Sequence, residues 1–263
     1  MLNLPAIVRK LREEKHLNNV GTKLDFSNRG CLMSKASQLF KQVIKGGRKS
    51  LLETEAKTVC MEYGIPVTKF KLAKNETETL KFAASIGFPI VLKIVSPDII
   101  HKSDVGGVVV GIKNAQEVRS GYRHIMDNVK KHDPKARIVG MLVQEMAPAG
   151  TEVIVGSIKD PQFGPALMFG LGGVFVEVLK DVTFRIAPVN EDEAAEMIGE
   201  VKAYPLLKGY RNMPPADLKA IIKILLNTSK LVMDNPEIKE LDLNPIMVYE
   251  KGAKTVDARI ILE

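Results

Sequence analysis

Residues 88–112 have the sequence FPIVLKIVSPDIIHKSDVGGVVVGI, which predicts a strand, a polar loop and a returning strand. The apolar first strand contains one charge, Lys93, which is costly there unless it faces a cleft or an anion. The polar loop at 101–104 is followed by Gly106 and Gly107, whose backbone N–H groups can approach phosphate oxygens without a Cβ in the way. This arm carries an ammonium group, backbone donors and an imidazole, a combination that favours phosphate chemistry.

The composition is that of an ordinary globular protein, with 45% hydrophobic and 26% charged residues. A chain of 263 residues can form one large or two small domains. No uninterrupted apolar stretch reaches the roughly 18 residues that a membrane span needs, so we expect no membrane association. The two cysteines, Cys31 and Cys60, make neither a disulfide framework nor a metal site, which favours a cytoplasmic location.

The net charge of +7 is concentrated near the N-terminus. Residues 1–50 carry eleven Lys and Arg against three Asp and Glu, whereas the remainder carries 27 against 28. A nucleic-acid-binding domain would need a basic face with stacking aromatics, but aromatics are only 5% and Trp is absent. We therefore expect no nucleic-acid partner. We expect residues 1–49 to form a basic extension, of which residues 1–32 are dispensable for the fold.

Helices and strands alternate from residue 50 onward, which predicts a mixed α and β class. Ser50 and Glu53 have the spacing of a capping box at the start of a helix that ends at Gly64. The glycine-rich residues 170–173 predict a turn between two strands.

The last segment, IKELDLNPIMVYEKGAKTVDARIIL, predicts two strands joined by a turn at residues 251–252. Asn244 and Asp257 lie on the two strands of this hairpin, so their side-chain oxygens can converge. Oxygen donors of this kind suit Mg²⁺, which keeps several waters and bridges phosphates.

Four blocks of the chain carry a family resemblance: EAKTVCMEYGIPV, KIVSPDIIHKSDVGGV, DPQFGPALMFGLGGVFVEVLKDVTFR, and KELDLNPI with VDARIIL. Together they make residues 50–262 resemble the ATP-grasp domain of the β subunit of ADP-forming acyl-CoA (acetyl-CoA) synthetases, and more distantly the succinyl-CoA synthetase β subunit. The resemblance implies an α+β ATP-grasp fold whose two lobes clasp a nucleotide within residues 50–263. The small lobe would span about 71–144, and the large lobe about 50–70 plus 145–263.

The resemblance also implies an acid–thiol ligase that interconverts acyl-CoA, ADP and phosphate with carboxylate, CoA and ATP through a phosphohistidine relay. His101 would receive the phosphoryl group and pass it to ADP, since imidazole is a neutral nucleophile near pH 7 and its phosphoramidate is a high-energy donor. An α subunit, often in an α₂β₂ assembly among relatives, would carry the CoA-binding and acyl-phosphate-forming site. The acyl group, the choice of ADP over GDP and the direction of the reaction are therefore not specified by this chain.

The resemblance assigns roles to individual residues. Lys93 would neutralise nucleotide phosphates beside the catalytic His101. Asn244 and Asp257 match the Mg²⁺ ligands of the succinyl-CoA relatives. Seven residues match positions that bind ATP or ADP: Lys93, Ser103, Gly106, Gly107, Glu145, Met146 and Glu152. Among them, Glu145 and the Met146 backbone would contact adenine, and Glu152 would contact the ribose.

Each assignment has a plain structural alternative. His101 could be a solvent-facing loop histidine, Lys93 could extend its ammonium group from a strand end to water, and Asp257 could pair with Arg259 or Lys254. Two other functions also stay open from the sequence. One is an ATP-grasp ligase that forms acyl phosphate directly, and the other is a non-catalytic nucleotide-binding regulatory module.

Overall fold

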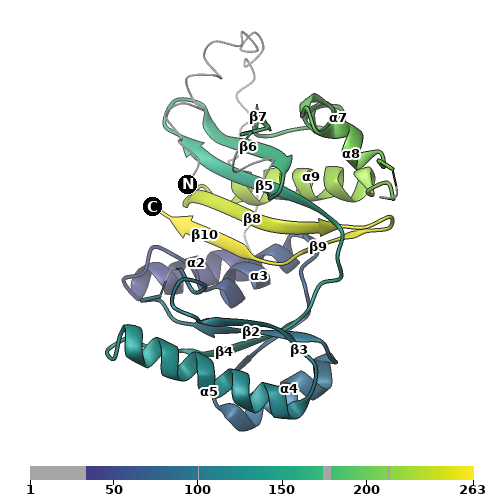
Figure 1. The fold of residues 1–263 in the computed structure, drawn as a ribbon. Coiled ribbons are helices and arrows are strands. Elements are labelled where there is room, and N and C mark those ends of the chain that lie inside the picture. The colour runs from purple at the N-terminus through teal and green to yellow at the C-terminus, as the bar shows by residue number, and fades with distance from the viewer. Residues whose placement is uncertain (1–33, 100, 174–178, 212–213) are drawn as a thin grey trace.

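The computed structural model describes residues 34–99, 101–173, 179–211 and 214–263, which form two lobes built on separate antiparallel sheets (Figure 1). The small lobe is a four-stranded sheet in the order β1-β4-β2-β3, with α4 and α5 packed against it. Its elements along the chain are β1 (Phe70–Ala73), α4 (Glu76–Ile86), β2 (Ile90–Val95), β3 (Val108–Ile112), α5 (Ala115–His132) and β4 (Gly140–Glu145).

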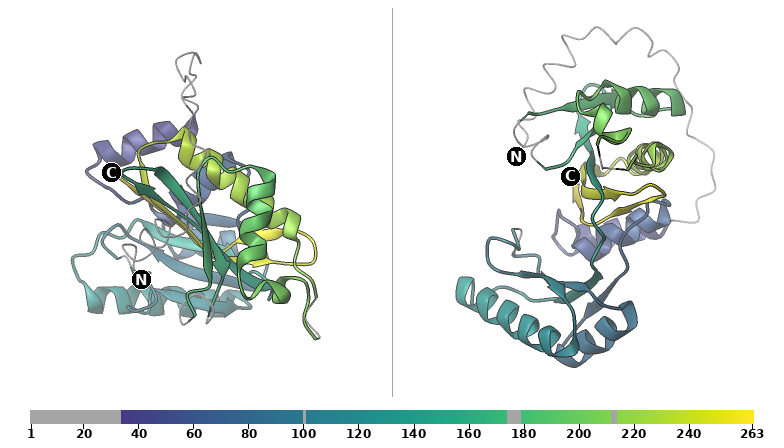
Figure 2. Two further views of the ribbon diagram at one scale, coloured as in Figure 1. Left: turned by 90° about the horizontal axis from the view of Figure 1, so that it is seen from above. Right: turned by 45° about the vertical axis from the view of Figure 1, so that its right-hand side comes forward.

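The large lobe contains the six-stranded sheet, in the order β10-β8-β5-β6-β7, with β9 paired to β8. Helices α7 and α9 pack against strands of this sheet, and α3 packs against β10. Figure 2 shows α2 and α3 between this sheet and the small lobe. The elements are α2 (Lys35–Lys45), α3 (Glu53–Glu62), β5 (Thr151–Asp160), β6 (Gly164–Leu171), β7 (Val182–Ile186), α7 (Glu191–Glu200), α8 (Tyr204–Leu207), α9 (Leu218–Asp234), β8 (Ile238–Val248), β9 (Ala253–Thr255) and β10 (Ala258–Leu262).

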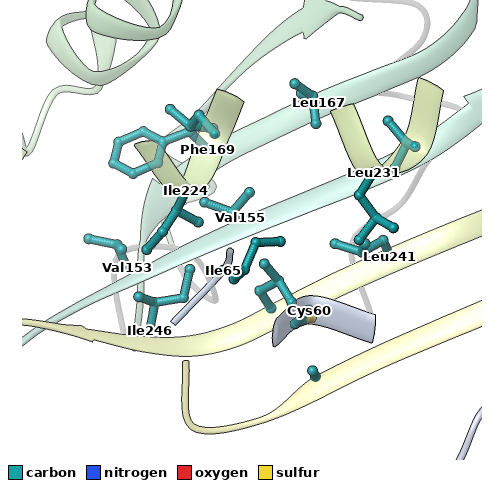
Figure 3. Close-up of a cluster of buried hydrophobic side chains, with 14 of the residues drawn as sticks. Cys60, Ile65, Val153, Val155, Leu167, Phe169, Ile224, Leu231, Leu241 and Ile246 are labelled. Atoms are coloured by element: carbon teal, nitrogen blue, oxygen red, sulfur yellow. The ribbon is translucent and has the colours of Figure 1, made fainter. Parts of the chain in front are cut away.

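Each lobe has its own apolar core, as alternation in the strands requires. In the large lobe, Val155 and Phe169 of neighbouring strands cluster with Ile224 of α9 and Cys60 of α3 (Figure 3). Phe169 is fully buried, and full burial of such a side chain stabilises the fold by about 2–3 kcal/mol. The rigid sheets therefore fix the strand ends from which the polar residues project.

The N-terminal boundary of the folded body lies earlier than the sequence indicated. We expected residues 1–49 to form an extension, but α2 places Ala36, Phe40 and Val43 in the large-lobe core, where all three are buried. The sequence does predict a helix over residues 33–45 from the spacing of its apolar residues, but we placed this helix in the extension because the ordered body was expected to begin at Ser50. The prediction that residues 1–32 are dispensable concerns a segment outside the described residues.

The capping box predicted at Ser50 and Glu53 is wrong. Helix α3 begins at Glu53, and Glu55 instead accepts the backbone N–H of the N-cap residue Leu52 at 2.7 Å. Ser50 pairs with Ile261 in a β-bridge. The Glu53 side chain is therefore free for another role. Of the strands predicted around the glycine turn, the first is β6, and part of the second falls on residues 174–178, outside the described chain.

The C-terminal hairpin forms as predicted, with β8 paired to both β9 and β10 around a turn in which Tyr249 N–H donates to the Gly252 carbonyl at 3.0 Å. Within the described residues, no helix is long and apolar enough to cross a membrane.

Candidate active site

A buried carboxylate, Glu53, lies where the two lobes meet and is contacted by three ammonium groups. Lys93 of β2 reaches Glu53 Oε1 at 2.7 Å, and Lys57 of α3 reaches the same oxygen at 3.1 Å. Lys102, from the polar loop after β2, reaches Glu53 Oε2 at 2.5 Å. Lys93 also contacts Asp257 Oδ2 at 3.0 Å. We call these five residues the Glu53 cluster; it brings together α3, the small-lobe sheet and the C-terminal hairpin.

The electrostatics of the Glu53 cluster favour an anion. Burial raises the pKa of Glu53, but the charges of Lys93, Lys57 and Lys102 outweigh it and lower that pKa to about 2. Burial also lowers the pKa of Lys93, but Glu53 and Asp257 more than compensate and raise it. At neutral pH three ammonium groups thus face two carboxylates. The positive excess lies beside the lysine that the sequence assigned to phosphate.

Lys57 ties the two lobes together beneath this site. Its ammonium group is fully buried and donates to Thr68 Oγ1 at 3.1 Å and to the Gln144 side-chain oxygen of β4. It also lies over the Phe70 ring, 5.5 Å from its centroid. Burial lowers the pKa of Lys57 to about 8, with Glu53 acting in the opposite direction. Lys57 is thus enclosed, whereas Lys93 keeps 7% of its surface exposed.

The two residues predicted to bind Mg²⁺ are joined by a backbone hydrogen bond. Asn244 N–H donates to the Asp257 carbonyl at 3.3 Å, and both side chains are at least partly exposed. Among the described residues, no three His, Cys, Asp or Glu side chains form a metal cluster. One carboxylate and one amide fit Mg²⁺ bound to phosphates, because that ion takes its remaining ligands from phosphate oxygens and water. The pairing of Asp257 is with Lys93, rather than with Arg259 or Lys254.

Asp242 lies next to the predicted Mg²⁺ ligands and was not singled out from the sequence. It precedes Asn244 by two positions on β8, so alternation puts both side chains on one face of the sheet. The side chain is exposed on one side, but the surrounding protein partly desolvates its carboxyl group, and this desolvation raises its pKa. Arg259, its cross-strand neighbour, lowers that pKa, and Asp257 raises it further. The alternation of polar Asp242 and Asn244 around Leu243 could have indicated from the sequence that the two polar side chains share a face.

His101 is exposed in the loop between β2 and β3. The glycines of this loop close its turn: Gly106 N–H donates to the Ser103 carbonyl at 3.1 Å, and Gly107 N–H to the Lys102 carbonyl at 2.7 Å. A Cβ on Gly107 would lie 2.7 Å from Ile94 Cγ2, so only glycine fits. Neither N–H is free for phosphate in this conformation. The predicted phosphate contacts of Gly106 and Gly107 therefore require the loop to rearrange, and that of Ser103, which is exposed, stays a prediction.

The predicted adenine end is arranged differently from the Glu53 cluster. Glu145 Oε1 accepts the Lys69 backbone N–H and the Lys254 ammonium group, each at 2.8 Å. Burial raises the pKa of Glu145, but these donors lower it overall. Met146 N–H donates to the Pro89 carbonyl at 3.1 Å, which leaves its carbonyl and its exposed side chain for a base. The Glu145 carboxylate thus links β4 to Lys69, which precedes β1, and to Lys254 of β9. The assignment of adenine to this position stays a prediction.

Glu152 lies on β5, beside the glycine-rich turn. The Gly172 N–H donates to the Glu152 carbonyl at 2.8 Å. A Cβ at Gly172 would lie 2.9 Å from the Cβ of Glu152, so glycine gives this exposed carboxylate its space. The predicted contact of Glu152 with the ribose is not tested by this geometry.

Comparison with known proteins agrees with this architecture. The ATP-grasp domain family matches residues 42–262 of the chain. The chain belongs to the ATP-grasp family. Within it, the β subunit of acetate–CoA ligase (ADP-forming) I from Pyrococcus furiosus is 51% identical over 230 residues, which are 88% of this chain and 99% of the relative. An ATP-grasp match that begins at residue 42 also agrees with an early start of the folded body.

Solved structures of a related synthetase contain nucleotide analogues. Acetyl-coenzyme A synthetase 1 of Ca. Korarchaeum cryptofilum, in complex with coenzyme A and Ca-AMPCP, superposes with a TM-score of 0.85 and 55% identity over 87% of this chain and 100% of that chain. A second structure of that synthetase, with Mg-AMPPCP, has a TM-score of 0.78 and 51% identity, over the same shares of the two chains. Its phosphohistidine segment points towards the nucleotide binding site.

Another relative carries the same ATP-grasp domain within a longer chain. Acetate–CoA ligase (ADP-forming) I of Archaeoglobus fulgidus is 49% identical over 87% of this chain, but the match covers only 33% of that relative. Two thirds of that protein therefore have no counterpart in the matched region.

Proposed function

We propose that this chain is the nucleotide-binding β subunit of an ADP-forming acetyl-CoA synthetase, and that His101 carries a phosphoryl group to ADP. The observation that supports this most directly is the Glu53 cluster. Lys93 contacts both Glu53 and Asp257. Lys102, in the loop that contains His101, forms an ion pair with the same Glu53. The predicted phosphate-binding lysine and metal ligand therefore belong to one connected set of side chains, which includes Lys102, the residue next to the predicted nucleophile.

The residues divide the chemistry between them. Lys93 and the positive excess around Glu53 bind and orient the phosphates of ADP. Asp257 and Asn244 would hold Mg²⁺, which supplies charge neutralisation between phosphate oxygens. In the transfer, the P–N bond of phosphorylated His101 breaks as a terminal oxygen of ADP bonds to phosphorus. The imidazole leaves and regains a proton, and ATP forms.

A labelling experiment on the full chain tests this function. The chain is incubated with Mg²⁺ and ATP labelled in the γ-phosphate, which runs the transfer in reverse. We expect stoichiometric label that is acid-labile and base-stable, because a phosphoramidate has that stability. His101→Ala should take no label, whereas His132→Ala, which changes an exposed histidine at the end of α5, should label normally.

Other outcomes would overturn the proposal. An unlabelled wild-type chain would favour the regulatory module, provided that it binds ATP. Label that persists in His101→Ala would place the phosphoryl acceptor elsewhere. A chain that forms acyl phosphate from ATP and acetate without His101 would be a direct ligase.

The acyl chemistry belongs to a partner. The Pyrococcus relative is named as subunit β, and the Archaeoglobus relative has two thirds of its length outside the shared domain. We propose that an α subunit supplies the CoA and acyl-phosphate site, in an α₂β₂ assembly. The purified chain should then make no ATP from acetyl-CoA, ADP and phosphate. Turnover by the single polypeptide would refute the need for a partner.

A further inference from the structure

The loop that carries His101 is attached at its root to the small lobe. The Gly107 carbonyl accepts Ile94 N–H of β2 at 2.8 Å, and Asn128 Nδ2 of α5 donates to the Gly106 carbonyl at 3.3 Å. These contacts fix the end of the loop next to β3. They leave the orientation of residues 101–105 to other interactions.

One ion pair connects residues 101–105 to the large lobe. Within the part of the chain that the structure describes, Lys102 to Glu53 is the only hydrogen bond or ion pair from these five residues to the other lobe. It joins α3 to the residue next to His101. The Lys102 side chain is 19% exposed and that of Glu53 2%, so water screens this pair far less than it screens a surface pair.

We infer that Lys102 is a positioning residue whose ion pair with Glu53 holds the His101 loop at the nucleotide side, and that the loop leaves this position by breaking the pair. This inference rests on the proposed function. Glu53 also contacts Lys93, so the Lys102–Glu53 ion pair holds the loop close to the lysine that we propose to bind the phosphates.

The geometry also allows the pair to break at moderate cost. A buried carboxylate stripped of its only partner would be strongly destabilised. Glu53 is not left alone when Lys102 departs, because Lys57 and Lys93 still contact it at 3.1 and 2.7 Å. Lys102 is itself partly exposed, so its ammonium group regains water. A loop that docks firmly and releases without an unpaired buried charge suits a relay between two sites.

Amide hydrogen exchange tests docking without any phosphoryl transfer. The full chain with Lys102→Gln should exchange the Gly106 and Gly107 amides, which donate to carbonyls of the loop, about tenfold faster than wild type, because opening becomes easier. Lys102→Arg, which keeps the charge, should stay within about threefold of wild type. Lys113→Gln, which changes an exposed lysine just beyond β3, is the matched control and should leave these amides unchanged. Equal exchange in Lys102→Gln and wild type would overturn the inference.

Single-turnover labelling by ATP and Mg²⁺ then tests positioning for transfer. Lys102→Gln should lower the maximal rate of His101 labelling about tenfold and leave the half-saturating ATP concentration within about twofold, while Lys102→Arg restores the rate. A raised half-saturating concentration with an unchanged maximal rate would make Lys102 a phosphate ligand and overturn the inference. Labelling of Lys102→Gln at the wild-type rate would overturn it too.

The two proposals fail in different ways. If the wild-type chain takes no label, the proposed function fails, while hydrogen exchange still reports whether Lys102 docks the loop. If the wild-type chain labels on His101 and Lys102→Gln matches it in both experiments, the function stands and the positioning role is refuted.

Discussion

Two carboxylates, Glu53 and Glu145, tie the small lobe to the large one, and they do so differently. Glu53 belongs to the large lobe, its side chain is 2% exposed, and it meets three ammonium groups. Glu145 belongs to the small-lobe strand β4 and its side chain is 16% exposed. Its partners among the described residues are the ammonium group of Lys254 and the Lys69 backbone N–H.

The difference lies in charge balance. The Glu53 cluster has more ammonium groups than carboxylates, so an added anion can bind without removing the last partner of Glu53. Glu145 and Lys254 form a balanced pair, so an anion that competed for Lys254 would leave Glu145 with only the Lys69 backbone N–H among its described partners. The Glu53 cluster therefore has the charge to attract an anion, whereas the Glu145–Lys254 pair is suited to a permanent contact between the lobes.

The largest effect should come from Glu53→Gln, which leaves three lysines around a neutral side chain. Removal of one member of a buried ion pair costs about 3–5 kcal/mol in the free energy of unfolding, because the remaining charges stay desolvated. Urea unfolding followed by far-UV circular dichroism measures this loss. The exposed residue Glu250 provides the control, since Glu250→Gln should change the free energy by less than about 0.5 kcal/mol. A loss below about 1 kcal/mol in Glu53→Gln would show that the cluster is not held by this carboxylate.

A slightly smaller effect is expected from pH. The folded pKa of Glu53 is about 2 and its ordinary value is 4.5, so the folded state favours the ionised carboxylate. Its contribution, about 3 kcal/mol, is fully present above pH 4.5 and is lost as the pH falls toward 2. Urea unfolding at a series of pH values from 5.5 to 3 should show wild type and Glu53→Gln converging by about 2 kcal/mol. Parallel curves would contradict the depressed pKa.

The smallest effect belongs to the other carboxylate. Glu145→Gln should lower the free energy of unfolding by only about 1 kcal/mol, since its partner Lys254 is 36% exposed at the side chain and water compensates the loss. Adding 0.5 M NaCl should reduce this difference, because salt screens an accessible pair. The same salt should leave the cost of Glu53→Gln nearly unchanged. If both costs fell equally, the contrast between the two carboxylates would be lost.

The sequence predicted the fold class, the buried environment of Lys93 and the C-terminal hairpin for physical reasons that are local. Alternating strands and helices indicated the α+β class, and the charge of Lys93 in an apolar strand required an anionic partner. The turn at Gly252 placed Asn244 beside Asp257 in the backbone. These inferences depend on period, spacing and desolvation, which a single segment reveals.

Glu53 could not be found in the same way. Its partners come from three separate segments, and only Lys57, four residues on, is local. The available signal was that this i, i+4 pair flanks an apolar helix face, but the capping-box spacing offered a simpler local explanation. The hydrogen bonds of the loop glycines could not be predicted either, because the carbonyls that accept their N–H groups come into place only when the turn closes. Their contact with phosphate stays a prediction.

Lys93 has one partner 40 residues away in the chain and another 164 residues away. A nascent chain that has completed only the small lobe and α3 would carry the lysine and Glu53 without the Asp257 carboxylate. We expect such a chain to lack metal-dependent nucleotide chemistry until the large sheet has closed. Under the proposed function, phosphorylation of His101 would therefore begin only after residue 257 has been synthesised and has folded onto Lys93.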